Sequence, residues 1–231
     1  MPDRVSSEEA FGRPLVCIVD DDSSVRRQLR RQLRFAGYDV ETFESSGALL
    51  AFSLPLRPLC LLLDVRLSGI SGIDLYEQLK QKGPVPPAVF LTGFGGVPLA
   101  TRAMKEGAVD FLEKPVRKSV LLGAVRTALE LSRQALFERD ELSSLKMRYE
   151  SLTPRERQVL DHVVSGQLNK QTAFDLGISE ATIKVHRARV MQKMAADSLA
   201  DLTLMALALG RVERRPQPAS PARTRQAGVH A

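Results

Sequence analysis

The chain of 231 residues has no tryptophan, only 5% aromatic residues, two cysteines and three histidines. The histidines are scattered along the sequence, which excludes a zinc centre built from closely spaced cysteine and histidine ligands. Hydrophobic residues make up 44% and charged residues 26%, a composition typical of globular proteins rather than disordered or fibrous ones. The length suits one large domain or, as we expect here, two smaller ones.

Long hydrophobic runs are also missing. The longest nearly uninterrupted apolar stretch, residues 202–209, is far below the roughly 20 residues that a membrane-spanning helix needs, so we expect no membrane span. The polar and acidic N-terminus lacks the basic segment and apolar run of a secretory signal. We therefore expect a cytoplasmic protein with no membrane partner.

The positive net charge of +6 is unevenly distributed. Residues 211–231 carry +4, whereas residues 1–118, 119–150 and 151–210 carry only +1, 0 and +1. The C-terminal segment is rich in Pro, Arg, Ala and Gln without an apolar stripe, which predicts a disordered basic tail. Total charge alone therefore does not indicate a folded surface for nucleic acid.

Strand and helix patterns alternate between residues 15 and 130. The apolar run at 15–19 is typical of a buried parallel strand, and Ser23 or Ser24 can cap the helix that follows it and ends at Gly37. Further strands are expected at 38–43, 60–64, 88–92 and 109–115, and further helices from about residue 46, at 72–80, at 98–107 and from about residue 119. This order predicts a flavodoxin-like, doubly wound α/β domain with a five-stranded parallel sheet, preceded by an extension at 1–14.

Polar residues stand where these strands end: Asp20, Asp21, Asp64, Thr92 and Lys114. In such sheets ligands bind beyond the carboxyl ends of the strands. Gathered carboxylates repel one another unless a cation lies among them, and their hard oxygen atoms suit Mg²⁺. A lysine and a hydroxyl at the same edge would complete a site for a phosphoryl group. Any one of these acids alone would be read as a solvated helix cap.

Cys17 lies three residues before Asp20, while Cys60 lies four residues before Asp64. Because side chains alternate along a strand, this difference predicts that the two thiols face opposite sides of the sheet. We expect two small buried hydrophobic side chains in a reducing compartment, without a disulfide.

Residues 15–130 resemble the receiver domain of two-component response regulators. The motifs are VDDD at 19–22, LLLDVRLSGISG at 61–72, LTG at 91–93 and DFLEKP at 110–115. The resemblance implies that Asp64 accepts a phosphate from a sensor histidine kinase. It also implies that Asp20, Asp21, Asp64 and the backbone carbonyl of Arg66 hold Mg²⁺ or Mn²⁺.

The same resemblance implies that Thr92 and Lys114 bind the phosphoryl oxygens, that Phe111 is the aromatic residue of a Thr/aromatic switch, and that the Lys114–Pro115 peptide is cis. Asp22 matches no ligand position and is interpreted as a solvated acid or a local cap. Two positions depart from the family pattern: Ser68 stands where proline is common, and Phe94 stands where a polar residue is common. We hypothesise that Phe94 limits water access to the phosphorylated site; a loop aromatic without a kinetic role is the alternative.

Residues 119–150 combine apolar positions with balanced charges, and neither Gly nor Pro occurs at 124–153. One interpretation is a long continuous helix that serves as a relay or a coiled-coil dimer seam. The other is a helix that covers the first domain and is followed by a loose connection. Three heptads are not clearly sustained, which slightly favours the second. We assign 131–149 as a helical linker.

A second module is expected at 150–210. Thr153, Pro154 and Glu156 form a capping-box pattern that opens a helix, and Asn169 can cap the next one. Gly177 then provides a turn before Ser179, which caps a third helix, and a fourth begins at about residue 198. Two short helices joined by a glycine-containing turn describe a helix-turn-helix, here at 169–188.

The third helix of this module contains four basic side chains and no acid over residues 181–196. Residues 150–210 resemble the LuxR-type DNA-binding domain through LTPRERQVL at 152–160, the pair at 169–170 and ISEATIKVHR at 178–187. The resemblance implies a recognition helix after Ser179. The expected DNA-contacting residues are Ser179, Thr182, Lys184, Val185, Arg187 and Arg189. In the fourth helix, Leu202, Met205 and Leu209 are expected either to contact a second subunit or to cover the core.

Together the two modules resemble the FixJ/NarL class of response regulators, with GAVDFLEKP at 107–115 and KVHRARVMQKM at 184–194 closer to the FixJ-like branch. The resemblance implies a cytoplasmic, phosphorylation-dependent transcription regulator and activator, and no enzyme beyond its own phosphoryl transfer and dephosphorylation. Implied partners are a sensor histidine kinase, double-stranded promoter DNA, RNA polymerase and, on phosphorylation or on DNA, a second copy. The alternatives are a phosphohydrolase, an autoinducer-binding regulator, and a regulator that acts on other proteins without DNA.

Overall fold

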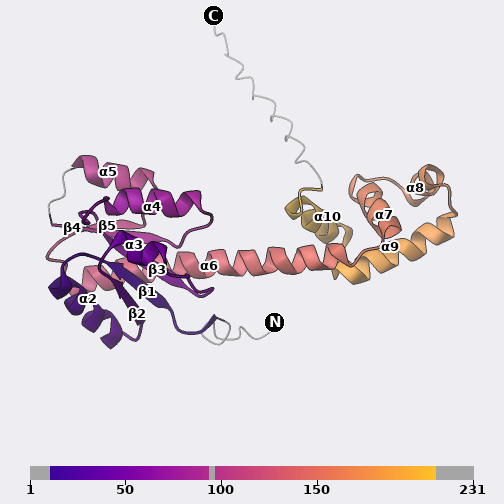
Figure 1. The fold of residues 1–231 in the computed structure, drawn as a ribbon. Helices are drawn as coiled ribbons and strands as arrows, with labels where there is room; N and C mark the ends of the chain where they lie inside the picture. The colour runs from indigo at the N-terminus through magenta and orange to yellow at the C-terminus, as the bar shows by residue number, and fades with distance from the viewer. Residues whose placement is uncertain (1–10, 94–96, 212–231) are drawn as a thin grey trace, which may run out of the picture. The chain divides into compact units, whose positions relative to one another are not determined.

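The computed structural model describes residues 11–93 and 97–211. The chain divides into two compact units, residues 1–139 and residues 140–231 (Figure 1). Phe94 and nearly all of the predicted disordered tail, from residue 212 onward, lie outside the described residues. In the described part of the chain, no helix is both long and apolar enough to cross a membrane.

The first unit is built on a parallel sheet of five strands in the order β2-β1-β3-β4-β5. The predicted five-stranded, doubly wound α/β fold is therefore confirmed. Strand β1 lies between β2 and β3, so the direction in which the chain crosses the sheet reverses there, and this reversal is where such sheets bind ligands. The strands are β1 (Leu15–Val19), β2 (Asp39–Phe43), β3 (Leu59–Asp64), β4 (Ala88–Thr92) and β5 (Asp110–Glu113).

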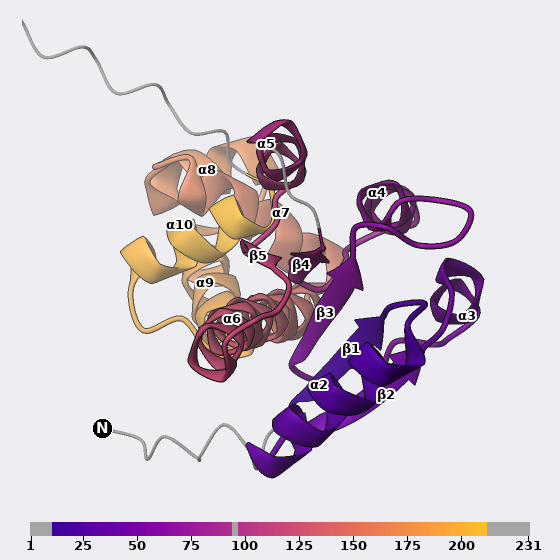
Figure 2. The same cartoon turned by 90° about the vertical axis from the view of Figure 1, so that its left-hand side faces the viewer.

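Helices cover both faces of this sheet, as Figure 2 shows. One face packs against α2 (Ser23–Phe35) and the first part of α6 (Lys118–Glu150) through Leu29, Leu33, Leu121 and Val125. The opposite face packs against α3 (Ser46–Leu50), α4 (Gly72–Gln81) and α5 (Val97–Lys105). All residues of β1, β3 and β4 are buried, which is the burial expected of central parallel strands.

The two cysteines belong to different cores. Cys17 packs on the α3–α4–α5 side of the sheet, whereas Cys60 packs on the α2–α6 side. Both are buried and free, as the alternation of side chains predicts. Burial raises the pKa of the Cys17 thiol to about 12, and burial also raises the pKa of the Cys60 thiol. Both side chains therefore stay protonated and act as small hydrophobic residues.

Helix α6 runs without interruption from Lys118 to Glu150, so the interpretation as a helix followed by a loose connection is wrong. The helical conformation continues through Gly123 and on to Glu150. Side-chain contacts one turn apart stabilise the helix: Arg133 pairs with Glu130 at 2.8 Å, and Gln134 donates to Glu138 at 3.0 Å. The boundary between the two compact units falls inside this helix.

The second unit is helical and contains the end of α6 followed by α7 (Pro154–Val164), α8 (Asn169–Leu176), α9 (Glu180–Met194) and α10 (Leu199–Ala208). The predicted capping box is present, since Thr153 Oγ1 accepts from the backbone of Glu156 and Glu156 accepts from the backbone of Thr153. Leu202 is fully buried, and Met205 and Leu209 pack against the same core. All three residues therefore contribute to the core, and contact of Met205 and Leu209 with a second subunit stays a prediction.

Two helix caps differ from the serine and asparagine caps that were expected, while the interpretation of Asp22 as a local cap is confirmed. Asp22, not Ser23 or Ser24, caps α2, because its Oδ1 accepts from the backbone of Ser24 at 2.7 Å. Leu168, not Asn169, precedes the first helical residue of α8. The side chain of Gln171 bonds the backbone N–H of Leu168 at 2.9 Å, which leaves the Asn169 side chain available for a contact with α9.

Candidate functional site

Three carboxylates meet at the carboxyl ends of β1 and β3. These strands are adjacent and in register, with Val19 opposite Leu63, so the residues that follow them come together. One oxygen of each of Asp20, Asp21 and Asp64 lies within 4.8 Å of the others. Asp20 is fully buried and Asp64 is 6% exposed, whereas Asp21 is exposed. The cluster is therefore buried on one side and open to solvent on the other.

Lys114 joins this cluster from the loop after β5. Its Nζ lies 2.6 Å from Asp20 Oδ2 and 3.0 Å from Asp64 Oδ2. Burial opposes the charge on Lys114, but hydrogen bonds with Asp20 and Asp64 outweigh it and raise the lysine pKa. Burial raises the pKa of Asp64, and the charge of Asp20 adds to that, while Lys114 counteracts it. One lysine thus compensates two buried acids only in part.

The donor set fits a divalent cation. Asp64 Oδ1 is buried and has no hydrogen-bond partner among the described residues, although its carboxylate accepts from the backbone of Arg66. A buried acceptor without a partner is costly unless a ligand satisfies it. Carboxylate oxygens, together with a backbone carbonyl such as that of Arg66, are the hard ligands that Mg²⁺ prefers. The residues at this edge therefore suit Mg²⁺ better than a soft metal.

Three side chains or backbone positions that the sequence analysis did not assign support the cluster. Ser68 Oγ donates to Asp21 Oδ2 at 2.9 Å, and Arg26 donates to the backbone oxygen of Asp20 at 2.7 Å. A Cβ at Gly72 would lie 2.1 Å from the backbone oxygen of Asp64, so only glycine fits where α4 begins. Gly72, the last residue of the SGISG motif, is the one of the three that the sequence signals. The contacts of Ser68 and Arg26 follow no sequence spacing that would predict them.

The two predicted switch residues, Thr92 and Phe111, lie on the neighbouring strands β4 and β5. Thr92 is fully buried at the end of β4, and its backbone oxygen accepts from the N–H of Lys114 at 2.7 Å. Phe111 on β5 stands opposite Phe90 and packs, half-buried, against the α3–α4–α5 core. The Lys114–Pro115 peptide is cis. Thr92 and Lys114 are thus linked through backbone at the same edge as the acids.

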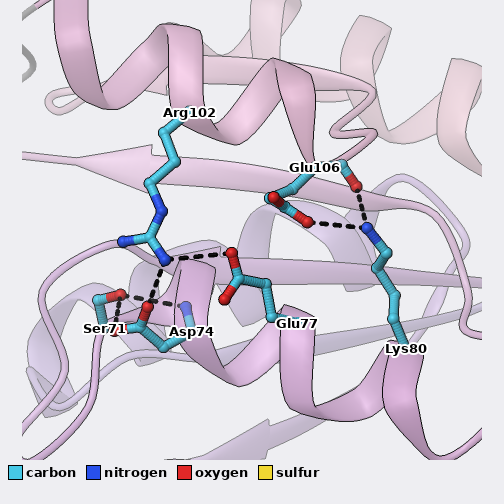
Figure 3. A network of polar contacts seen from close by, with 6 residues as sticks. All are labelled: Ser71, Asp74, Glu77, Lys80, Arg102 and Glu106. Atoms are coloured by element: carbon cyan, nitrogen blue, oxygen red, sulfur yellow. Dashed lines mark hydrogen bonds and ion pairs between the residues drawn. The ribbon is translucent and has the colours of Figure 1, made fainter.

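Charged contacts join α4 to α5 (Figure 3). Arg102 of α5 lies 2.6 Å from Asp74 Oδ1 and 3.1 Å from Glu77 Oε1, both on α4. Lys80 of α4 lies 2.9 Å from Glu106 Oε2, just after the end of α5. These pairs are partly exposed, so each contributes little to stability by itself. They connect α5 to the helix that begins beside Asp64.

The second unit presents a basic face on α9. Ser179 caps the helix by accepting from the backbone of Thr182 at 3.1 Å. Arg187 is half-buried and donates to Asn169 Oδ1 at 3.2 Å, which joins α9 to α8. Of the six predicted DNA-contacting residues, the remaining five are exposed: Ser179, Thr182, Lys184, Val185 and Arg189. The interior of the unit is on the other side of the helix, at Ile183, Val190 and Met194.

Lys193, the fourth basic residue of this segment, has an internal role. Its Nζ lies 2.7 Å from Glu156 Oε2 and donates to the backbone oxygen of Ser151 at 3.1 Å. The hydrogen bond from Lys193 lowers the pKa of the buried Glu156 carboxyl, and the bond from Thr153 adds to this effect. Lys193 therefore anchors the end of α9 to the start of α7.

Comparisons with known proteins assign a family to each of the two units that hold the acidic cluster and the basic face of α9. Residues 16–126 match the family of the response regulator receiver domain, and residues 150–206 match the family of bacterial regulatory proteins, luxR family. The chain is 46% identical to response regulator protein TodT of Pseudomonas putida over 188 residues, which cover 81% of this chain and 83% of that protein. It is 44% identical to transcriptional regulatory protein FixJ of Azorhizobium caulinodans over 195 residues, which cover 84% and 92%.

A solved structure agrees with these relatives. The low-resolution structure of response regulator StyR is 44% identical to this chain, with a TM-score of 0.76, and the match covers 84% of this chain and 98% of that one. Receiver domains bind Mg²⁺ through an acidic pocket, and here the corresponding cluster is Asp20, Asp21 and Asp64. The chain belongs to the FixJ-type response regulators of two-component systems, transcription regulators in which a receiver domain precedes a LuxR-type DNA-binding domain.

Proposed function

We propose that this regulator is a cytoplasmic transcriptional activator that is switched by phosphorylation of Asp64. The observation that carries the proposal is the cluster at the end of β3: a buried carboxylate with one oxygen that lacks a partner and the other held 3.0 Å from Lys114 Nζ. We place the receiver domain at 15–130, the helical linker at 131–149 and the DNA-binding domain at 150–210.

In the proposed reaction a carboxylate oxygen of Asp64 attacks the phosphorus of a phosphohistidine on the kinase. The new O–P bond forms as the P–N bond breaks, and the histidine nitrogen keeps the electron pair. Lys114 offsets the negative charge that collects on the phosphoryl oxygens, and the Thr92 hydroxyl donates to one of them. Mg²⁺ or Mn²⁺, held by Asp20, Asp21, Asp64 and the carbonyl of Arg66, would supply further charge neutralisation.

We propose that the chain's chemistry stops at this transfer and the later hydrolysis of its own acyl phosphate. The phosphorylated carboxylate carries a charge of about −1.5 to −2 at neutral pH. Thr92 then moves toward the phosphoryl group, and Phe111 follows into the space beside β4. The surface formed by β4, α5 and β5 changes shape as a result, and this change favours pairing with a second phosphorylated copy.

For the output we propose that α9 enters the major groove of promoter DNA. Lys184, Arg187 and Arg189 supply contacts to bases and phosphates, together with Thr182 and Val185 of the same helix and its N-cap Ser179. A dimer reads two half-sites and recruits RNA polymerase to the promoter. The relatives named transcriptional regulatory protein FixJ support the transcriptional part of this proposal.

The test compares Asp64→Asn with Asp22→Asn, which removes an exposed acid next to the cluster. With acetyl phosphate and Mg²⁺, the Asp64→Asn protein should take up no phosphate, while Asp22→Asn should be labelled like the wild type. A gel shift with a promoter fragment should then show tighter binding only for the labelled proteins. Persistent labelling of Asp64→Asn at unchanged stoichiometry would assign the acceptor to another residue.

A further inference from the structure

Helix α2 carries five arginines and no acidic residue: Arg26, Arg27, Arg30, Arg31 and Arg34. Within the described residues, none of them forms an ion pair with a carboxylate. Their two side-chain hydrogen bonds go to uncharged oxygens, from Arg26 to the backbone of Asp20 at 2.7 Å and from Arg27 to Ser23 Oγ at 3.2 Å. The helix therefore holds a concentrated positive charge that the protein itself does not neutralise.

This concentration works against the helix. Arginines four residues apart, as at 26 and 30, 27 and 31, and 30 and 34, repel one another. Two of the five lie in the first turns, where the helix dipole favours negative rather than positive charge. The buried face of α2 needs only apolar residues such as Leu29 and Leu33. Packing thus does not require the arginines, and a bound anion would relieve their repulsion.

Three of these arginines line a hollow of about 180 Å³ between α2 and the edge strand β2. The lining consists of Ser23, Arg26, Arg27, Arg30 and Thr42, and it contains no carboxylate. Guanidinium groups bind phosphate oxygens through paired N–H donors, and the two hydroxyls can donate to the same anion. The charge and the donor groups that line the hollow therefore match a phosphate-bearing ligand rather than a cation or an apolar group.

We propose that this hollow binds the diphosphate or terminal phosphate groups of a small phosphorylated compound. The site is distinct from the cluster around Asp64, whose three carboxylates repel anions when no divalent cation is bound. It gives the receiver domain a second input, which depends on the concentration of a soluble phosphate compound rather than on the histidine kinase.

The test uses the full-length protein in EDTA, with inorganic pyrophosphate as the probe and chloride added to keep the ionic strength constant. Two-dimensional NMR follows the Nε–Hε signals of the arginine side chains. Saturable shifts are expected for Arg27 and Arg30 with a stoichiometry of one. Arg30→Gln should weaken binding about tenfold, because hydrogen bonds between charged groups are lost. Thermal melting should show that this variant, changed at an exposed side chain, remains folded.

Arg31→Gln is the matched control. Arg31 lies on the same helix, is exposed and loses the same charge, but it does not line the hollow. Its affinity for pyrophosphate should stay within about twofold of the wild type, since only distant, screened charge is removed.

An equal loss of affinity in both variants, or shifts that do not saturate, would indicate diffuse electrostatic attraction and overturn the proposal of a specific site. Shifts at Arg30 with a nonspecific DNA duplex but not with pyrophosphate would assign the surface to DNA and also overturn it.

Discussion

The acidic cluster and the basic face of α9 are built in opposite ways. Asp20, Asp64 and Lys114 come from three separate strand ends and are largely buried, and the lysine contacts the two acids at 2.6 and 3.0 Å. The α9 face comes from one continuous segment, and five of its six side chains are exposed. Their contacts are mostly local, such as the ion pair of Lys184 with Glu180 at 3.5 Å within the same helix. The charges of the cluster balance one another, so the loss of one residue leaves the charges of the others uncompensated. We therefore expect exposed residues of the face, such as Lys184 and Arg189, to act nearly independently.

Removal of the lysine should give the largest effect. Lys114→Gln leaves two buried carboxylates without their cation and should destabilise the receiver domain in EDTA by about 3 kcal/mol. Mg²⁺ should restore part of that loss, because it replaces the missing positive charge. Urea unfolding with and without Mg²⁺ measures both quantities. Lys80→Gln, which breaks a partly exposed pair, should cost less than about 1 kcal/mol, and an equal cost for both would break the comparison.

A backbone change should come next. Gly72→Ala places a Cβ 2.1 Å from the backbone oxygen of Asp64, so the start of α4 or the end of β3 must shift. We expect a loss of about 2 kcal/mol from overpacking and slower phosphorylation by acetyl phosphate. Gly123→Ala is the control, since nothing lies within 4 Å of its Cβ and alanine favours a helix by up to about 1 kcal/mol. Normal phosphorylation of Gly72→Ala would show that the cluster tolerates displacement.

The buried pair of the second unit allows a pH test. The lowered pKa of Glu156 means that its ionised form stabilises the fold above its unfolded pKa of about 4.3, and that this stabilisation is lost as pH falls through the folded value. Glu156→Gln should therefore cost about 1–2 kcal/mol at pH 7 and progressively less below pH 4. Thermal melts across this range check the trend. A difference that stays constant with pH would mean that the charge of Glu156 does not contribute.

The smallest single effects are expected on the exposed face. Lys184→Ala and Arg189→Ala should each weaken DNA binding by about 1 kcal/mol, and the double variant should show the sum. Fluorescence anisotropy with a promoter duplex at fixed salt provides the measurement. Lys146→Ala removes an exposed charge from α6 and serves as the control. A double variant far from additive would place these residues in a coupled network like the one around Asp64.

The sequence predicts the residues of the acidic cluster better than the hydrogen bonds that support the sites. Asp20, Asp64, Thr92 and Lys114 could be grouped because the carboxyl ends of parallel strands meet at one edge of a sheet. The Ser68–Asp21 and Arg187–Asn169 hydrogen bonds could not, because they join elements whose spacing in the sequence carries no signal. The role of Lys193 could not be predicted either, because its acidic partner Glu156 lies 37 residues away in the sequence.

Helix continuity and burial also depend on tertiary context. The weak heptad pattern of residues 119–150 argued against one long helix, yet the absence of breaking residues was the stronger signal. The apolar pattern of Leu202, Met205 and Leu209 fits a dimer contact or the core, and only the packing of α10 on the other helices shows their contribution to the core. The near-balanced charge over residues 1–118 conceals the local cluster of arginines beside α2, so the net charge of this region does not indicate the hollow.

The contact between Gly72 and Asp64 also has a mechanical consequence. The backbone N–H of Gly72 donates to the oxygen of Val65 at 3.0 Å, so the first turn of α4 rests directly on the backbone that follows β3. Ion pairs from Arg102 and Lys80 then connect α4 to α5 and the residue after it. A displacement of the main chain at Asp64 would therefore also displace the first turn of α4, and the ion pairs would couple it to α5 by a second route beside the one proposed through Thr92 and Phe111.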